Sequence, residues 1–352
     1  MAIAAAHVYR YALPLTAPLR TADAARAERT GLLLRLDGDD GGTGWGEAAP
    51  LPGFSAESPE DAAEALTAVA SRLPGAEAEE GMGDHPALPA AVRFAVEGAR
   101  LGLRAAEGPR SVPQLLGAAG PSVSINALLT ADESDPAAEA RRLAACGFRA
   151  VKVKVGGGTL EADVRRVRAV AAALGPAVRL RLDANRAWTP AEAVSFFDAL
   201  GAVPIEYIEE PLADPEALPS FAAQTGRPVA LDETTREHGP AVLDALAPVA
   251  AVVLKPTLLG GLAATREWAR AARDHDATPV VSAAYESGVG LRLLAAQAAA
   301  LSDAPAGLST YTRLADDVLS PRLPLDGPSA PLDRLFEATV TDTRLDRLHS
   351  AH

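Results

Sequence analysis

The feature that most constrains the fold of this chain is a strand-like run that recurs eight times between residues 122 and 312. The runs are SVSINALL from residue 122, AVKVKV from 150, VRLRLDAN from 178, IEYIEEP from 205, PVALDE from 228, AVVLKP from 251, PVVSAAYES from 279 and AGLSTYT from 306. Most are followed by a segment rich in Ala, Leu and Arg, with apolar residues at helical spacing. Eight strands alternating with helices predict a parallel sheet that closes as a (β/α)8-type barrel, with the modified (β/α)7β closure as a variant. An open doubly wound sheet would need a glycine-rich phosphate turn after its first strand, and the sequence has none there.

The first third of the chain has a different pattern. HVYRYALPL and TGLLLRLDG resemble antiparallel strands, and two helical segments follow them. We therefore predict an α+β capping domain over residues 1–105 and a barrel domain over residues 106–325. The tail, residues 326–352, is expected to return and pack on the cap.

Charge and cysteine content exclude several classes of function. The formal net charge is −13, which argues against a nucleic-acid or membrane-surface partner, because both favour a basic face. The single cysteine, Cys146, excludes an internal disulfide framework, and we expect it to be a packed thiol. The N-terminus does not resemble a signal peptide, and no apolar run is long enough to span a bilayer. These features favour a soluble, cytoplasmic protein, and they give no indication of oligomeric state.

Lysine is scarce in this chain. Of the 33 basic residues, only Lys152, Lys154 and Lys255 are lysines, which leaves 33 − 3 = 30 arginines. Most surface lysines tolerate replacement by arginine, but a site that moves a proton through an amine does not, because guanidinium stays charged. The three remaining lysines are therefore candidates for chemistry.

Polar residues gather at the C-terminal ends of the strand-like runs, which is where the active site of a (β/α)8 barrel lies. Acids end three successive runs, and lysines lie on the runs to either side. The candidates are Lys152 and Lys154 on the second run, Arg181, Asp183 and Asn185 on the third, Glu209 and Glu210 on the fourth, Asp232 and Glu233 on the fifth, Lys255 on the sixth, and Ser282 and Glu286 on the seventh.

Three converging carboxylates repel one another unless a cation compensates them. Oxygen ligands without His or Cys suit a hard ion, with Mg²⁺ the first choice and Mn²⁺ the alternative. With a lysine on each side, this arrangement is typical of proton abstraction next to a carboxylate, in which the metal neutralises the developing enolate.

These residues resemble the enolase superfamily, in its muconate-lactonizing-enzyme-like subgroup. The resemblance covers the cap, the barrel and the returning tail, and it is carried by GWGEAAPLPGFSAES, VKVKVG, LRLDANRAWTP, IEEP and LDE. Together these motifs are most similar to the o-succinylbenzoate synthases of menaquinone biosynthesis. The superfamily uses a Lys or His base with Mg²⁺ to stabilise an enediolate.

The resemblance implies a lyase that dehydrates 2-succinyl-6-hydroxy-2,4-cyclohexadiene-1-carboxylate to 2-succinylbenzoate with syn stereochemistry. It places the metal ligands on Asp183, Glu209 and Asp232, the proton-transferring lysine at Lys154 and the enolate-stabilising lysine at Lys255. The remaining implied residues support the ligands or contact the substrate. They are Lys152, Arg181, Asn185, Glu233, Ser282, Phe54 and Ser55.

Other activities use the same lysines and acids. N-acylamino acid racemisation and dipeptide epimerisation need a lysine on each face of the substrate, and Lys154 and Lys255 supply both. Dipeptide epimerases commonly carry an Asp-x-Asp pair on the eighth strand, where this chain has Ser309, Thr310 and Tyr311. A scaffold barrel without catalysis would be expected to have lost a ligand or a lysine, and here every position is filled. A phosphate-binding barrel enzyme would need glycine-rich turns after the seventh and eighth strands, and the segment ESGVG from residue 286 supplies only a partial one.

Overall fold

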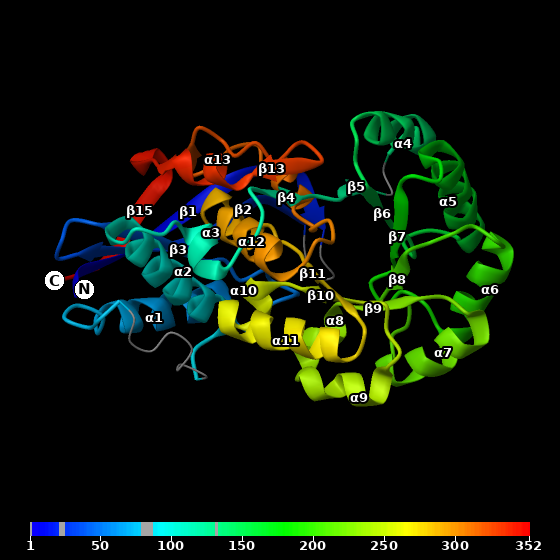
Figure 1. The fold of residues 1–352 in the computed structure, drawn as a ribbon, viewed down its shortest axis with the longest axis horizontal. Coiled ribbons are helices and arrows are strands. Elements are labelled where there is room, and N and C mark those ends of the chain that lie inside the picture. Colours follow the sequence, from blue (N-terminus) through cyan, green and yellow to red (C-terminus); the bar gives the residue numbers. More distant parts are fainter. Residues whose placement is uncertain (1, 21–24, 79–86, 131–132) are drawn as a thin grey trace.

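The computed structural model describes residues 2–20, 25–78, 87–130 and 133–352. Figure 1 shows two parts, with a strand-rich cap on one side and a barrel surrounded by helices on the other. The cap sheet is antiparallel and has the strand order β15-β1-β2-β3. Its strands are β1 (Ile3–Arg20), β2 (Ala25–Gly38), β3 (Thr43–Ala48) and β15 (Leu345–Ala351).

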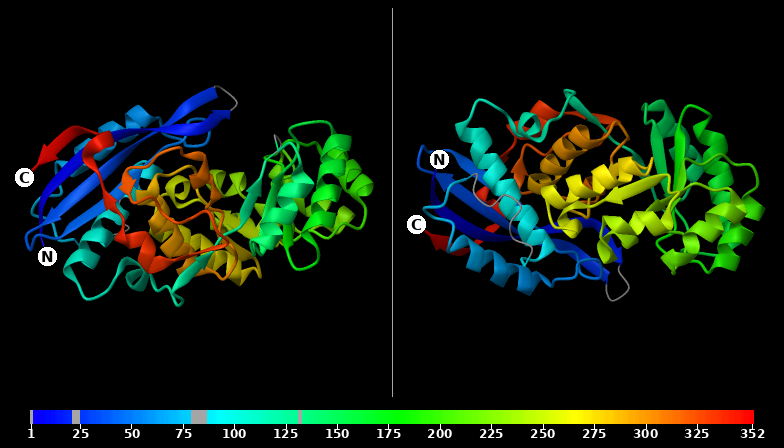
Figure 2. Two further views of the ribbon diagram at one scale, coloured as in Figure 1. Left: turned by 90° about the horizontal axis from the view of Figure 1, so that it is seen from above. Right: turned by 60° about the horizontal axis from the view of Figure 1, so that its bottom comes forward.

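The C-terminal tail completes the cap sheet. β15 pairs antiparallel with β1, so both chain termini lie at the cap end of the molecule (Figures 1 and 2). Helices α1 (Pro59–Ala70) and α2 (Ala90–Glu107) complete the cap. The close approach of α2 to β3 depends on glycine, because a Cβ at Gly46 would overlap the carbonyl oxygen of Ala95.

The barrel sheet has seven hydrogen-bonded parallel strands in sequential order. They are β5 (Ala127–Leu129), β6 (Ala150–Lys154), β7 (Arg179–Asp183), β8 (Tyr207–Glu209), β9 (Val229–Leu231), β10 (Ala251–Leu254) and β11 (Thr278–Val281). Parallel bridges from Ile125 to Ala306 and from Ser282 to Gly307 join the two edges of this sheet. The predicted combination of a barrel and a cap is confirmed, with the eighth strand reduced to a two-residue closure.

Helices follow the barrel strands and cover the sheet from outside (Figure 2). They are α4 (Pro136–Ala145), α5 (Leu160–Leu174), α6 (Pro190–Leu200), α7 (Leu218–Thr225), α8 (Glu233–Glu237), α9 (Leu243–Leu246), α10 (Pro256–Leu259), α11 (Leu262–Asp274) and α12 (Gly288–Leu301). Their starts follow the sequence: Thr189 caps α6 in a reciprocal capping box with Glu192, and Pro190 occupies the first turn. None of the helices in the described part of the chain is both long enough and apolar enough to cross a bilayer.

Shorter elements fill the junction between the barrel and the cap. They are α3 (Val112–Leu116), β4 (Ser122–Ser124) paired with β13 (Ser329–Pro331), β12 (Leu319–Ser320) paired with β14 (Thr339–Val340), α13 (Leu332–Glu337), and 3-10 turns at Pro215–Ala217, Pro240–Val242, Ser309–Arg313 and Asp342–Arg344.

Two expectations from the sequence need correction here. The run from residue 306 was predicted as a full strand, but its second half is the 3-10 turn Ser309–Arg313, in which the Oγ of Ser309 donates to the carbonyl of Asn126. The expected packed thiol of Cys146 is exposed. Cys146 is the residue at which α4 ends, and the buried face of that helix is formed by Ala140 and Leu143.

A buried carboxylate joins the cap to the barrel. Glu47 of β3 is 1% exposed and accepts hydrogen bonds from the Tyr11 hydroxyl, the Ser287 backbone N–H and hydroxyl, and the Gly290 backbone N–H. Ser287 and Gly290 lie at the start of α12, the helix that follows the seventh barrel strand. Burial raises the pKa of the Glu47 carboxyl, although the hydrogen bonds from Ser287 and Tyr11 oppose that rise.

We expect Glu47→Ala to lower the free energy of unfolding by about 3 kcal/mol or more, because it leaves several buried donors without a partner. Urea denaturation followed by circular dichroism measures this change. Glu267→Ala is the matched control, since Glu267 is exposed on α11 and should change stability by less than about 0.5 kcal/mol. Equal stability of the two variants would show that the cap–barrel junction does not depend on Glu47.

Candidate active site

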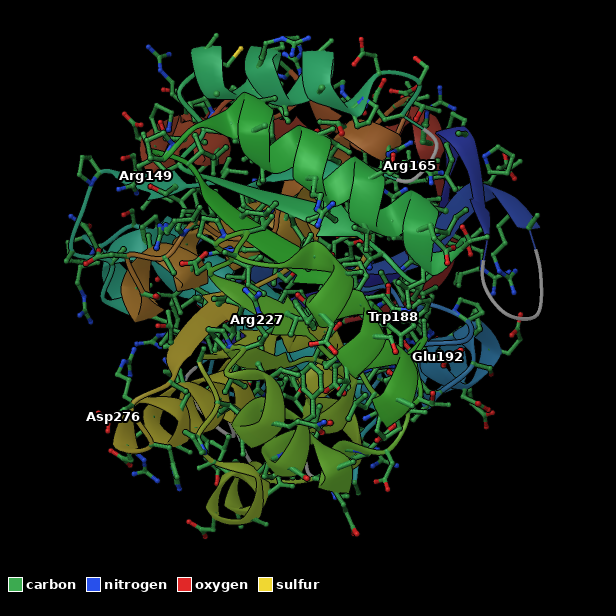
Figure 3. The ribbon with its side chains drawn as sticks, turned by 90° about the vertical axis from the view of Figure 1, so that its right-hand side faces the viewer. Arg149, Arg165, Trp188, Glu192, Arg227 and Asp276 are labelled. Carbon is green, nitrogen blue, oxygen red and sulfur yellow. The ribbon has the colours of Figure 1, made fainter. Side chains whose placement is uncertain are left out.

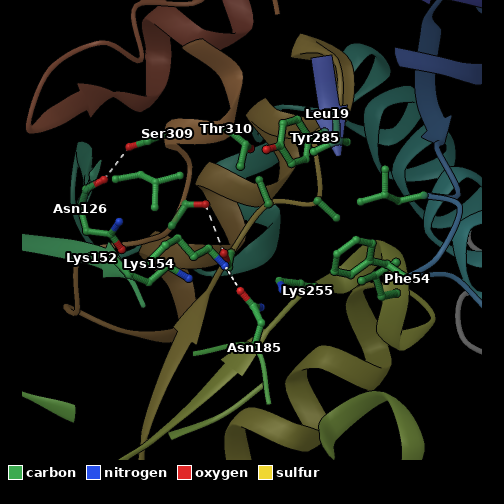
Figure 4. A pocket seen from close by; sticks show the side chains of 17 residues that line it. Leu19, Phe54, Asn126, Lys152, Lys154, Asn185, Lys255, Tyr285, Ser309 and Thr310 are labelled. Atoms are coloured by element: carbon green, nitrogen blue, oxygen red, sulfur yellow. Dashed lines mark hydrogen bonds between the residues drawn. The ribbon is translucent and has the colours of Figure 1, made fainter. Parts of the chain in front are cut away.

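A cavity of about 260 Å³ opens at the C-terminal ends of the barrel strands, beneath the cap. The cap contributes Leu19, Leu51 and Phe54 to its wall. All three lysines of the chain line it (Figure 4). The other lining residues are Asn126, Leu128, Asn185, Leu258, Ser282, Ala283, Ala284, Tyr285, Gly307, Ser309 and Thr310.

Strand register brings the charged residues together beneath this cavity. Lys154 on β6 is opposite Asp183 on β7, and Asp183 is opposite Glu209 on β8. Neighbouring strands in a sheet lie about 4.8 Å apart, so residues in register have adjacent side chains. Asp232 follows directly after β9. Asp183, Glu209 and Asp232 therefore form a row of acids across three neighbouring strands, called the acidic row below. All three carboxylates are at most 1% exposed.

Each lysine contacts a carboxylate. Lys152 Nζ lies 3.0 Å from an oxygen of Asp183 and 3.2 Å from one of Glu209. Lys154 Nζ lies 2.6 Å from Asp183, and Lys255 forms an ion pair with Asp232. The exposed fraction of the Lys154 side chain is 33%, against 12% for Lys152, so Lys154 is the more accessible amine of the two on β6.

Burial and ion pairing have opposite effects on two of these carboxyls. Burial raises the pKa of Asp183, but the positive charges of Lys152 and Lys154 outweigh it and hold that pKa below its ordinary value. Burial likewise opposes ionisation of Asp232, and Lys255 reverses the direction so that its pKa is lowered. Both carboxyls are therefore ionised at neutral pH.

Glu209 behaves differently. Burial and the negative charge of Asp183 raise the pKa of Glu209 well above its ordinary value, and Lys152 offsets only part of this. Burial lowers the pKa of Lys152, but Asp183 and Glu209 outweigh it and the amine stays protonated. Ionisation of Glu209 beside Asp183 is therefore unfavourable unless a further positive charge is bound nearby.

The three carboxylates fit a hard divalent cation. They offer oxygen donors from three adjacent strands, which is the ligand chemistry of Mg²⁺. The Oδ1 of Asp232 is buried and has no hydrogen-bond partner among the described residues. A buried carboxylate oxygen without a partner is costly unless a cation binds it. We therefore regard Asp183, Glu209 and Asp232 as the residues able to hold the metal.

Polar residues around this row hold its members in place. Asn185 donates through Nδ2 to Glu233 at 3.1 Å and accepts from Lys154 at 2.6 Å. Glu210 accepts from the backbone N–H of Asp232 at 2.9 Å and from that of Thr234 at 2.8 Å. Asn185 has a φ of 44° and Glu210 a φ of 39°. Such left-handed conformations of non-glycine residues gather at functional sites.

Arg181 does not line the cavity. It is 1% exposed and donates to Glu206 at 2.6 Å, to the side-chain oxygen of Asn126 at 3.0 Å and to the carbonyl of Pro305 at 2.7 Å. It thereby fixes Asn126, which does line the cavity, to the closing segment of the barrel.

The other predicted residues divide into two groups. Phe54 and Ser282 line the cavity. Ser55 does not, and its Oγ instead accepts from the Leu51 backbone N–H at 2.8 Å. Glu286 is fully buried and binds the Thr257 hydroxyl and the Ala284 backbone N–H, so it is part of the packing under the seventh strand.

Sequence reasoning missed Asn126 and Leu258, both of which line the cavity. A signal for Asn126 was present, because the chain contains only two asparagines, Asn126 and Asn185, and both lie at this site. Rarity of a residue type, which identified the lysines, would have identified it too. Leucine is common in this chain, so nothing in the sequence marks Leu258.

Family comparisons match both halves of the chain. Residues 135–333 match the family described as "Enolase C-terminal domain-like", and residues 3–103 match "MenC, N-terminal domain". The o-succinylbenzoate synthase of Enterobacter sp. (strain 638) is 36% identical over 301 residues, which cover 84% of this chain and 87% of that protein. The o-succinylbenzoate synthase of Citrobacter koseri is 36% identical over 302 residues, with the same coverage.

Solved structures share the same architecture. A dipeptide epimerase from Enterococcus faecalis V583, complexed with Mg and the dipeptide L-Leu-L-Tyr, has a TM-score of 0.83 and 25% identity, covering 94% of this chain and 99% of its own. A muconate lactonizing enzyme from Pseudomonas fluorescens, complexed with muconolactone, has a TM-score of 0.83 and 22% identity, covering 97% of this chain and 98% of its own. The second likeness concerns the fold alone.

Proposed function

Because the chain belongs to the enolase superfamily, and within it to the o-succinylbenzoate synthase family, we propose that it is a Mg²⁺-dependent lyase. Its reaction is the syn dehydration of 2-succinyl-6-hydroxy-2,4-cyclohexadiene-1-carboxylate to 2-succinylbenzoate, a step of menaquinone biosynthesis. The observation that carries the proposal is that all three lysines of the chain line one cavity above three buried carboxylates.

We assign Asp183, Glu209 and Asp232 as the metal ligands. Mg²⁺ bound there would neutralise negative charge that develops on the substrate carboxylate as it becomes an enolate. The chain's own contribution is to orient these carboxylates and to keep Asp183 and Asp232 ionised. Lys255 does this for Asp232 through their ion pair, and Glu210 does it through the Asp232 backbone N–H.

Lys154 is the proton-transferring group of the proposed reaction. Its amine nitrogen takes the proton from the carbon next to the substrate carboxylate, and the C–H bonding electrons pass into the enolate. The enolate then expels the hydroxyl group, the C–O bond breaks, and Lys154 returns the proton to the leaving oxygen to form water. One residue serves both steps, so the proton and the hydroxyl group leave from the same face.

Lys255 lies on the other side of the cavity. It follows β10, which is four strands away from β6 in a barrel of eight positions, so it faces Lys154 across the mouth. In the proposed reaction Lys255 stays protonated and stabilises the enolate by its charge. Lys152, held protonated by Asp183 and Glu209, supplies a second fixed positive charge for the substrate carboxylate.

The proposal is tested with purified protein, the cyclohexadiene substrate and Mg²⁺, by following the ultraviolet absorbance of the aromatic product. We expect turnover of about 1–10³ s⁻¹, the usual range for enzymes. EDTA should abolish it and added Mg²⁺ should restore it. Failure to form product while calorimetry shows bound Mg²⁺ would contradict the proposed activity.

A second candidate activity is racemisation of an N-acylamino acid or epimerisation of a dipeptide. The observation in its favour is the presence of an amine on each side of the cavity, Lys154 and Lys255. It predicts that the protein in D₂O exchanges the α-hydrogen of an N-succinylamino acid or a dipeptide for deuterium, which proton NMR detects. A protein that dehydrates the cyclohexadiene and exchanges neither compound would exclude this second activity.

A further inference from the structure

A tight turn of the cap places one aromatic ring in the wall of the cavity. Phe54 N–H donates to the Leu51 carbonyl at 2.9 Å, and the central residues of this turn are Pro52 and Gly53. Gly53 has a φ of 86°, which the third position of a type II turn requires and which glycine adopts without strain. The turn presents Phe54 to the cavity on the side of Lys255, whereas Asn126 lies on the side of Lys152 (Figure 4).

Arg236 fastens this turn to the barrel. It lies on α8, which begins directly after Asp232. Its Nη1 donates to the carbonyl of Phe54 at 2.6 Å, and its guanidinium lies 5.6 Å from the centre of the Phe54 ring. The Arg236 side chain is 17% exposed, so both contacts are largely shielded from water. A charged donor in such a setting forms a strong hydrogen bond.

The same arginine is connected to the proposed base. Arg236 Nη2 lies 3.9 Å from Glu233, which accepts from Asn185 at 3.1 Å. Asn185 in turn accepts from Lys154 at 2.6 Å. A continuous polar path therefore runs from Lys154 through two side chains to the residue that holds Phe54.

We propose that Arg236 is a positioning residue that keeps the Phe54 turn closed against the cavity. Phe54 then forms an apolar wall for the carbon skeleton of the bound substrate. The proposal rests on the proposed function for the identity of that substrate. It assigns Arg236 no contact with the reacting atoms, so the main effect of losing it falls on substrate binding rather than on the chemical step.

Arg236→Met removes the hydrogen bond and the cation–π contact and keeps a similar volume. We expect KM to rise about 10-fold, the effect of losing a charged hydrogen bond of roughly 1.5 kcal/mol. We expect kcat to change by less than about 3-fold, because the lost contact stabilises the bound substrate and the transition state equally. Arg236→Lys keeps a charged donor and should bring KM at least halfway back on a logarithmic scale. Steady-state kinetics on the cyclohexadiene substrate measures both constants.

Arg227 provides a matched control. It also donates to a backbone carbonyl, that of Val203 at 3.0 Å, and its guanidinium lies 5.1 Å from the ring centre of Phe197. It precedes β9, at the opposite end of that strand from Asp232, and Figure 3 labels it among the elements of the barrel. Arg227→Met should lower the melting temperature as Arg236→Met does but leave KM within about 2-fold of wild type.

A double-mutant cycle tests whether Arg236 acts through Phe54. If it does, Arg236→Met should raise KM much less in a Phe54→Leu background than in the wild type, because contacting residues are coupled. Full additivity of the two substitutions would overturn the proposal. An equal rise in KM for the Arg227 and Arg236 variants would overturn it as well.

Hydrogen–deuterium exchange separates this proposal from the proposed function, because it needs no substrate. We expect the backbone amides of residues 51–57 to exchange at least about 10-fold faster in Arg236→Met than in wild type or Arg227→Met, since their opening costs less free energy. Unchanged exchange in this segment would contradict the role of Arg236, whatever the enzyme acts on. A wild-type protein without dehydratase activity would instead contradict only the proposed function.

Discussion

Lys154→Arg is expected to lower kcat for dehydration by about 10²–10⁴-fold, the usual contribution of a general acid–base group. Arginine keeps the positive charge and can retain the ion pair with Asp183, but its guanidinium does not give up a proton. The substitution therefore removes proton transfer while leaving the electrostatics of the row nearly intact. Turnover, measured by absorbance at saturating Mg²⁺, checks the result.

Lys255→Arg is the matched comparison. The proposed role of Lys255 is to supply fixed charge, which arginine also supplies, so we expect a loss of only about 10-fold. Both variants should bind Mg²⁺ with near wild-type affinity in calorimetry. A Lys154→Arg enzyme with more than a tenth of wild-type activity would exclude Lys154 as the base. An equally deep loss in the two variants would favour chemistry that uses both lysines.

Asp183→Asn is expected to have two effects, one on the metal and one on the fold. It removes the carboxylate on β7, one of the three proposed ligands, so Mg²⁺ affinity should fall about 100-fold or more, beyond the 10–100-fold typical of residues that only support ligands. It also leaves Lys152 and Lys154 without their closest anion. Breaking a buried ion pair on one side typically costs about 3–5 kcal/mol.

Calorimetric titration with Mg²⁺ measures the first effect of Asp183→Asn, and urea denaturation in EDTA measures the second. Asp198→Asn is the control for the loss of one acid, because Asp198 is exposed on α6 and should change neither quantity appreciably. Wild-type Mg²⁺ affinity in the Asp183→Asn protein would remove Asp183 from the ligand set.

Local patterns in the sequence predicted the acids and lysines at the C-terminal ends of the barrel strands. Asp183, Glu209 and Asp232 could be placed because parallel strands end at one rim and period-two alternation fixes which side chains face the cavity. The lysines could be identified because arginine replaced lysine everywhere else. These inferences need only short stretches of chain and the rule that the active site of a (β/α)8 barrel lies at the C-terminal ends of its strands.

Contacts between distant segments could not be predicted in the same way. Arg236 and Phe54 are 182 positions apart, and no spacing rule connects an arginine on a short helix with a carbonyl in a cap turn. The eighth strand was overpredicted for a similar reason. The hydroxyl of Ser309 donates to the carbonyl of Asn126 in the neighbouring segment, where the barrel closes, and the turn that this favours has the same local composition as a strand.

The pairing of β15 with β1 protects an edge of the cap sheet. Residues 345–351 occupy the outer edge of this sheet, next to a strand far away in the sequence. Without them, β1 would present an open row of backbone groups of the kind that pairs with other chains. A variant lacking these few residues should therefore be prone to association.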